Sequence, residues 1–383
     1  MIWWQHLKLR SKDPHVRLKV IESLQLDQDA DPGAFALLEQ SLKDEDVQVR
    51  CAAAGGLGEL KDDRSTALLI ALLSASNQDT RQAAATALGH LGNAGAVDPL
   101  TQMLRAVSPQ DRASAGAALR SLGWVPATTE EQALFEVAIG NSRAAAFRGE
   151  AAVDPLVSEL KHDTSFARRS AAEALGGVHD PRRIRPLMTA ATDADPTVRV
   201  SAIHALATED GQSVVNTLLR ALRDHEGCVR LAAAQVLAKR DNPDFVPHFF
   251  GLLDDGNFEV RLATVQYLSR FAHPQITQAL LTLINDHDSD VRLAAANALG
   301  ASGDPAVIEG LVVALVDEER TIRHAAEQAL NQIDPNWPHS EAARRAGTRL
   351  EALLDTSPTW VRSAIQQLLA RLQGTAENLQ PAE

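Results

Sequence analysis

The chain has 383 residues and a formal net charge of -13 at pH 7, with 45% hydrophobic and only 4% aromatic residues. A long phosphate-binding surface needs clustered Lys and Arg, so the acidic balance disfavours nucleic acid as a partner. Cys51 and Cys228 lie in unrelated segments, so neither a disulfide framework nor a thiolate metal site is predicted. We therefore expect a cytoplasmic protein that needs no metal or other cofactor.

The first predicted element is a short N-terminal helix. It contains Trp3 and Trp4 followed by basic residues, and its apolar stretch is too short for a secretory signal or a membrane span. We expect the Trp side chains to cover the end of the core. The alternative is an amphipathic helix that touches a membrane surface.

One pattern then recurs along the chain: a β-branched residue, an Arg, small residues, and a Leu seven positions after the Arg, as in 229–237 and 291–299. These repeat arginines are Arg17, Arg50, Arg81, Arg112, Arg168, Arg199, Arg230, Arg261, Arg292, Arg323 and Arg362. Most intervals are 31 residues, but 56 residues separate Arg112 from Arg168 and 39 precede Arg362. A fixed period of this length predicts a repeat protein.

Within each unit, apolar residues recur at three- and four-residue spacing, which predicts two amphipathic helices and no strands. The glycines eleven residues after a repeat Arg should end the second helix in a left-handed conformation; they are Gly92, Gly123 and Gly303. Those eight residues after it should mark close helix contacts; they are Gly58, Gly89, Gly176 and Gly300. Asp-Pro dipeptides such as Asp304-Pro305 should open the next pair.

A single pair of such short helices cannot bury its apolar face, so the units must stack on one another. The predicted fold is all-α, a right-handed α-solenoid of about 11–12 antiparallel helix pairs. The predicted parts are an N-terminal block (1–125), a degenerate repeat or seam (126–152), regular 31-residue repeats (153–334), a capping repeat with an insertion (335–373) and a flexible tail (374–383). At the seam, Trp124 and Phe135 either fill the core or line a small-molecule pocket.

These residues resemble HEAT repeats, specifically the short bacterial class similar to those of phycobilisome lyases. The resemblance covers nearly all of residues 13–372, and its diagnostic feature is an Asp six residues before the repeat Arg. The Asp can accept turn amides and pair with an Arg of its own or the adjacent unit, which predicts a structural ladder. Its predicted members are Asp44, Arg50, Asp193, Arg199, Asp224, Arg230, Asp255, Arg261, Asp286, Arg292, Asp317 and Arg323.

Lyase-type members of that class handle a linear tetrapyrrole and a Cys-bearing partner, so the resemblance implies a phycobilin lyase, or a related phycobiliprotein-handling factor, as one hypothesis. It assigns no catalytic residue. Another HEAT-repeat enzyme, deoxyhypusine hydroxylase, holds two irons through several His-Glu dipeptides, whereas this chain has one, His225-Glu226. Turns two units apart are too distant for His225 and His287 to share an ion, so solvated turn histidines are predicted.

In HEAT-like solenoids the second helices line the concave face. The fifth residue after the repeat Arg reads Thr86, Glu173, His204, Gln235, Gln266, Asn297 and Gln328, with Lys239 and Arg270 one turn further on. The residues from His204 onwards form a neutral hydrogen-bonding row, which predicts either a site for an extended partner or a merely hydrated helix face.

Aromatic residues gather in two adjacent units of a chain that is otherwise poor in them. Phe249 and Phe250 are consecutive on a predicted helix and cannot both face one core, so one of them is a candidate contact residue. The leading hypothesis is a protein-interaction scaffold or chaperone-like adaptor that binds another protein on the concave face. The bilin lyase is its alternative.

Overall fold

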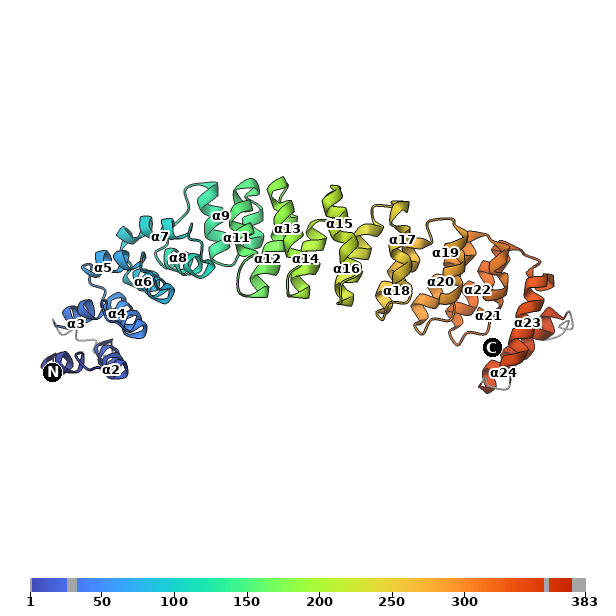
Figure 1. Ribbon diagram of the computed structural model, residues 1–383, viewed down its shortest axis with the longest axis horizontal. Coiled ribbons are helices and arrows are strands. Elements are labelled where there is room, and N and C mark those ends of the chain that lie inside the picture. Colours follow the sequence, from blue (N-terminus) through green and yellow to red (C-terminus); the bar gives the residue numbers. More distant parts are fainter. Residues whose placement is uncertain (1, 26–32, 355–357, 374–383) are drawn as a thin grey trace. The chain divides into compact units, whose positions relative to one another are not determined.

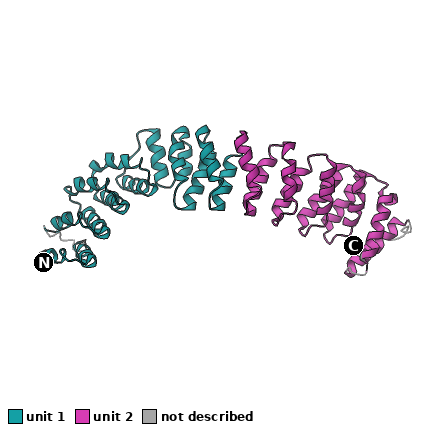
Figure 2. Cartoon of the chain, in the orientation of Figure 1, with its two compact units in different colours: residues 1–208 teal, residues 209–383 magenta. Residues whose placement is uncertain are grey.

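The computed structural model describes residues 2–25, 33–354 and 358–373, and within these ranges the secondary structure is helical, with no strands. The chain divides into two compact units, residues 1–208 and 209–383 (Figure 2).

Unit 1 contains fourteen α-helices in its described residues. They are α1 (Ile2–Lys8), α2 (Pro14–Gln25), α3 (Ala34–Ser41), α4 (Val47–Glu59), α5 (Ser65–Leu72), α6 (Gln78–Leu91), α7 (Val97–Met103), α8 (Pro109–Ser121), α9 (Thr129–Ala138), α10 (Ser142–Ala146), α11 (Val153–Glu159), α12 (Ser165–Gly176), α13 (Ile184–Ala190) and α14 (Pro196–Ala205). Short 3₁₀ turns precede three of them: η1 (Ala94–Ala96), η2 (Gly149–Ala152) and η3 (Pro181–Arg183).

Unit 2 continues the same alternation over its described residues. Its helices are α15 (Gln212–Ala221), α16 (Gly227–Ala238), α17 (Val246–Phe249), α18 (Phe258–Leu268), α19 (Pro274–Leu283), α20 (Ser289–Ser302), α21 (Ile308–Ala314), α22 (Arg320–Ile333), α23 (Glu341–Leu353) and α24 (Thr359–Leu372). Its 3₁₀ turns are η4 (Pro243–Phe245), η5 (Phe250–Leu252), η6 (Pro305–Val307) and η7 (Trp337–His339).

The helices stack as pairs in two layers. In unit 1, α4 packs on α6 and α6 on α8; in unit 2, α16 packs on α18, α18 on α20 and α20 on α22 (Figure 1). The even-numbered helices, each second in its pair, therefore form one layer, and the odd-numbered helices form the other. The predicted all-α solenoid of about 11–12 helix pairs is confirmed.

The second helices that begin after a residue whose side chain caps the helix include α4, α6, α8, α14, α18 and α20. A short polar residue with extended backbone accepts the first free amides of the helix, which leaves fewer N–H groups unpaired. These N-cap residues include Asp46, Asn77, Ser108, Asp195, Asn257 and Asp288. At the other end, Gly92, Gly123 and Gly303 have φ angles of 80°, 66° and 62°, so the predicted left-handed stops are confirmed.

Small residues let the second helices approach closely. A Cβ placed on Gly300 would lie 2.5 Å from the Cβ of Ala329 on the next second helix, and one on Gly58 would lie 2.7 Å from the carbonyl oxygen of Ala87. The corresponding distances are 2.9 Å for Gly89 and 3.2 Å for Gly176. All four glycines therefore mark the close contacts that their spacing predicts.

The seam interrupts the second-helix layer. Helix α10 has only five residues; α8 packs against α9, whereas α10 packs against α12. Trp124 and Phe135 form an edge-to-face pair with ring centroids 5.6 Å apart and pack against the hydrophobic core of unit 1. Of the two readings left open for these residues, the structure thus supports core filling.

The structure describes only part of the two chain ends for which the sequence made predictions. Trp4 is 61% exposed, with Lys8 5.6 Å from its ring centroid, so the expectation that it covers the core is wrong. The side chain of Trp3 and the predicted tail at 374–383 lie outside the described residues. The insertion before Arg362 places Trp337 in a fully buried position, where its Nε1 donates to Asn331 Oδ1 at 3.2 Å.

Candidate partner-binding surface

In ten of the repeat units, the repeat Arg holds the turn of its own unit through a backbone contact. Its Nη1 donates to the carbonyl oxygen of the residue six positions earlier, at 2.7 Å for both Arg230 and Arg261. The same contact is made by Arg17, Arg50, Arg81, Arg112, Arg168, Arg199, Arg292 and Arg323. Within its own unit, the repeat Arg therefore binds a backbone carbonyl and not the carboxylate of the turn Asp.

The turn Asp instead binds the Arg of the preceding unit. Arg230 donates through Nε and Nη2 to the two oxygens of Asp255, at 2.6 and 2.7 Å, and Arg261 binds Asp286 in the same way at 2.7 Å through both nitrogens. Equivalent two-point pairs are Arg17–Asp44, Arg168–Asp193 and Arg292–Asp317. We call these five pairs the Arg–Asp ladder.

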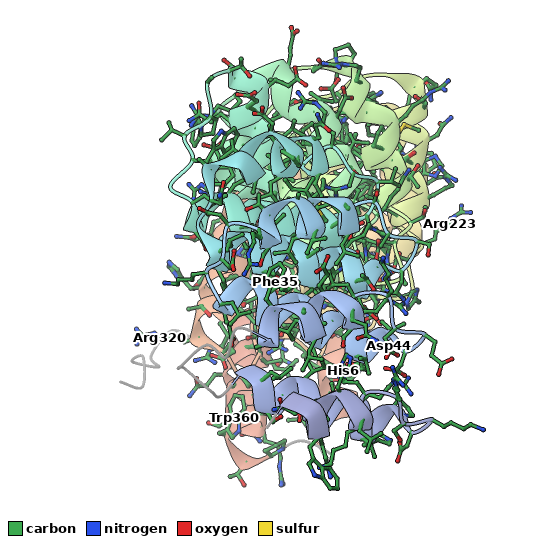
Figure 3. All side chains as sticks on the ribbon, turned by 90° about the vertical axis from the view of Figure 1, so that its left-hand side faces the viewer. His6, Phe35, Asp44, Arg223, Arg320 and Trp360 are labelled. Carbon is green, nitrogen blue, oxygen red and sulfur yellow. The ribbon has the colours of Figure 1, made fainter. Side chains whose placement is uncertain are left out.

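Each turn Asp also closes its own turn by accepting the amide two residues on. Asp44 lies in the turn between α3 and α4, at the edge of the helix stack, and accepts the Asp46 amide at 2.9 Å (Figure 3). The same bond is made by Asp193, Asp224, Asp255, Asp286 and Asp317. One carboxylate thus shapes a turn and fixes its register against the preceding unit, because two-point guanidinium contacts are geometrically strict.

Charge pairing in the ladder overcomes the cost of burial. Burial alone would raise the pKa of Asp255, but the hydrogen bonds from the Arg230 guanidinium and the Asn257 amide outweigh it and lower the pKa below its ordinary value. The same balance lowers the pKa of Asp286. The hydrogen bond to Asp255 correspondingly raises the pKa of Arg230. Both groups are therefore held in their charged forms.

The ladder departs from its pattern in unit 1, between Arg50 and the seam. The next unit has Ala75 in place of the turn Asp that would bind Arg50. Arg50 Nη1 donates to the backbone carbonyls of Asp44 and Glu45. Arg81 binds Asp111 at 2.8 Å, and the buried Arg112 reaches past the shortened unit to Glu159 on α11. Glu159 thus takes the place of the turn Asp as the partner of Arg112. It lies 47 residues after Arg112, so the 31-residue period could not predict it.

The ladder aligns one exposed row of side chains on the second helices of unit 2. Gln235, Gln266, Asn297 and Gln328 lie on α16, α18, α20 and α22, each five residues after its repeat Arg, and all are exposed. We call these four residues the carboxamide row and the exposed side of their helices the second-helix face. Gln328 Nε2 lies 3.0 Å from His324 Nε2 on its own helix.

Apolar and basic side chains flank the carboxamide row. One turn before it, Leu231, Leu262 and Leu293 are half-buried; we call them the leucine row. One turn after it, Lys239 and Arg270 are exposed, and Arg270 Nη1 donates to the carbonyl of Ala238 at 2.7 Å. The face therefore offers apolar contact area beside neutral donors and acceptors.

A sequence profile described as HEAT repeats matches residues 35–120, 131–207, 184–259 and 246–331, which is more than half of the chain. The chain belongs to the HEAT-repeat family. No curated protein matches it. Solved structures with a similar fold include an engineered protein, with 20% identity, 86% of this chain and 98% of that chain covered, and a TM-score of 0.40. YibA from Escherichia coli matches at 20% identity, with coverages of 72% and 94% and a TM-score of 0.41.

A further match comes from a study of the interaction between cadherin and β-catenin. It has 14% identity, coverages of 98% and 99%, and a TM-score of 0.42. Likenesses at these identities concern the fold alone.

The structure corrects one predicted contact residue of this HEAT-repeat protein. Phe249 is fully buried, with its ring centroid 4.0 Å from that of Tyr267, so it cannot reach a partner. Phe250 is half-buried and belongs to η5, in the first-helix part of its unit, whereas Gln266 lies on the second-helix face. The prediction of a contact residue in this pair is therefore wrong for Phe249 and stays a prediction for Phe250, which lies in the other helix layer from Gln266.

His204 and Gln367 also lie five residues after a repeat Arg, but neither belongs to the carboxamide row. His204 is exposed on α14 in unit 1, which is not placed relative to unit 2. Gln367 is exposed on α24, again five residues after a repeat Arg, and the Arg371–Glu327 ion pair of 3.0 Å links α24 to α22. Sequence reasoning missed Gln367 because the insertion hides the period there, although counting from Arg362 would have found it.

The described part of the chain contains no group of three or more His, Cys, Asp or Glu residues arranged to hold a metal ion. His225 and His287 are exposed, as predicted for turn histidines. None of the described helices is both long and apolar enough to cross a membrane.

A separate cavity of about 560 Å³ lies at the seam within unit 1. Arg105, Arg112, Glu130, Asp154 and Arg182 contribute to its walls, whereas Trp124 and Phe135 do not line it. Its rim charges are already paired, Arg105 with Glu130 at 2.9 Å and Arg182 with Asp154 at 3.2 Å. The seam pocket therefore differs from the aromatic-lined pocket considered from the sequence.

Proposed function

We propose that this HEAT-repeat protein is a cytoplasmic scaffold or chaperone-like adaptor that binds an extended segment of another protein on the second-helix face of unit 2. The observation that carries the proposal is the carboxamide row, four exposed neutral side chains at one position of four successively packed helices. The family membership supports a binding role, because repeat solenoids offer long continuous surfaces.

The chemistry of the row favours a polypeptide backbone as its ligand. A carboxamide both donates and accepts hydrogen bonds, as a peptide group does, whereas a charged side chain would have to be desolvated at greater cost when a partner covers it. Solubility alone would be served by Lys or Glu at these exposed positions. Four neutral carboxamides in register thus support recognition of backbone groups over simple hydration.

The test compares two triple variants. Gln235→Ala, Gln266→Ala and Asn297→Ala remove most of the carboxamide row. Three exposed carboxamides on the first-helix side of unit 2 give a control matched in number and type: Gln275→Ala, Gln278→Ala and Asn285→Ala. Affinity purification with mass spectrometry identifies the partner, and calorimetry with the purified partner then measures each variant.

Three lost hydrogen bonds at about 0.5–1.5 kcal/mol each should weaken binding by about tenfold or more. The control should bind as the unchanged protein does. Equal binding by both triple variants would show that the partner uses another surface.

The alternative stays a phycobilin lyase or related phycobiliprotein-handling factor, supported by the sequence resemblance to phycobilisome-lyase repeats. No cluster among the described residues favours it over the scaffold. Incubation of the purified protein with a bilin and an apo-phycobiliprotein separates the two, because a covalent chromophore adduct would favour the lyase.

A further inference from the structure

The carboxamide row repeats at the interval of packed helices. Helices in contact lie about 8–10 Å apart. A glycine, Gly300, narrows only the α20–α22 interval, because the same position is Ala238 on α16 and Ser269 at the C-cap of α18. A ligand that meets each helix in the same way must therefore repeat its own structure at about this distance.

Polyproline II geometry matches the interval, whereas a β-strand does not. A polyproline II helix has three residues per turn and a rise of about 3.1 Å per residue, so it repeats every ~9.3 Å. A β-strand repeats its side-chain direction every two residues, or about 6.6 Å. Only the three-residue repeat presents the same edge to successive second helices.

The leucine row gives one edge of such a ligand an apolar surface. Each Leu precedes its carboxamide by four residues, which is about 6 Å along the helix axis. An apolar side chain at every third position can rest on the leucine row while the backbone carbonyls of the same turn face the carboxamide row. Those carbonyls have no internal hydrogen bonds in polyproline II, so they are free to accept from the Gln and Asn amides.

Charge on the other side of the leucine row selects a basic ligand. Exposed carboxylates stand near the start of each second helix; we call Glu226, Glu259, Asp290 and Glu319 the acidic edge. The Arg–Asp ladder neutralises the turn aspartates, whereas in the described residues no Lys or Arg forms an ion pair with these four carboxylates; Glu226 lies 3.8 Å from the His225 ring. Arg223 and Arg320 are exposed basic side chains close in sequence to Glu226 and Glu319, and four carboxylates against these two cations leave the edge negative overall.

We propose that the occupant of the second-helix face is a basic polyproline II segment of a partner protein, with an apolar residue at every third position on the leucine row and a Lys or Arg at every third position towards the acidic edge. The inference rests on the proposed function and specifies its ligand. Twelve residues in this conformation span about 37 Å and supply one turn to each of the four helices. Three of these turns meet a leucine of the leucine row, and the fourth meets the exposed His324 on α22.

The test uses two synthetic peptides of identical composition. The first is (Leu-Lys-Pro)₄; the second contains the same residues in an order in which no residue type recurs every third position. Fluorescence anisotropy of labelled peptides measures affinity for the full chain, the carboxamide-row triple variant and its Gln275/Gln278/Asn285 control. Circular dichroism checks that every variant remains helical.

The period-three peptide should bind at least about tenfold more tightly than its isomer. Binding should fall about tenfold or more in the row variant and stay within about twofold in the control. Glu259→Gln combined with Asp290→Asn should weaken binding several-fold and reduce its dependence on salt.

Equal affinity for the two peptides, with loss in the row variant, would overturn the polyproline II inference while leaving the proposed function in place. Binding that ignores the row variant would overturn both. Failure of the period-three peptide to bind would overturn the inference, and the partner measurement described above would then decide the proposed function independently.

Discussion

Gly300→Ala tests whether close helix contact holds the repeats together. In most helices Gly→Ala stabilises by about 0.5–1 kcal/mol. Here the new Cβ would lie 2.5 Å from the Ala329 Cβ and 2.9 Å from its Cα, whereas carbon atoms pack at about 3.5–4.0 Å. Since backbone must move by about 1 Å, overpacking should cost about 1–3 kcal/mol and reverse the sign. We expect a net loss of roughly 0.5–2 kcal/mol.

Two further glycine substitutions compare sites with a looser contact and with no contact. A Cβ on Gly176 would lie 3.2 Å from Ala205, so Gly176→Ala should be nearly neutral, and one on Gly251 would meet nothing within 4 Å, so Gly251→Ala should cause no clash. Urea unfolding followed by circular dichroism measures stability, and hydrogen exchange in α20 and α22 localises the effect, since repeat arrays need not unfold in one step. Stabilisation by Gly300→Ala would refute the reasoning.

Three other predictions concern the ladder and the aromatic cluster. Asp286→Asn removes the charge that Arg261 binds and should cost about 1.5–3 kcal/mol in urea unfolding, whereas Asp290→Asn, on an exposed carboxylate nearby, should change stability by less than about 0.5 kcal/mol. The pKa of Asp286 is lower in the folded chain than its ordinary value of about 4. The ionised Asp286 carboxylate therefore stabilises the fold fully above about pH 4, and this stabilisation is lost as the pH falls below that value. A series of urea unfolding measurements at different pH values should show the loss, and Asp286→Asn should reduce the slope of the free energy of unfolding against pH. Tyr267→Phe removes the hydrogen bond to the Asn242 carbonyl and should lower the thermal midpoint, at a cost of about 1 kcal/mol, and an unchanged midpoint would count against that bond.

Local patterns predicted most of the fold because each repeat is built from near neighbours. The spacing of Gly58, Gly89 and Gly300 from their repeat arginines predicted tight contacts, and the distances to the following helix agree. The 56-residue interval between Arg112 and Arg168 contains α10, a second helix of only five residues. The internal arrangement of the seam was not predicted, since Arg112 pairs with Glu159 across a shortened unit and this depends on how α8, α9 and α11 pack.

The surface was predicted less completely than the fold. Gln235, Gln266, Asn297 and Gln328 are exposed on successive helices, because a fixed position after the repeat Arg faces one direction in every unit. The prediction of Phe249 as a contact residue was wrong because the sequence shows that aromatic residues cluster in these units, but it does not show which aromatic ring is buried.

By itself, the sequence determined the helix pairs, their period and the positions that share a face, since these follow from residue spacing along a single helix. Only the tertiary structure decided that the turn Asp binds the preceding unit's Arg, that Phe249 is buried and Trp4 exposed, and that the seam holds a cavity away from Trp124. Those outcomes depend on which surfaces of neighbouring helices meet, and that choice is made by packing between units rather than by any segment alone.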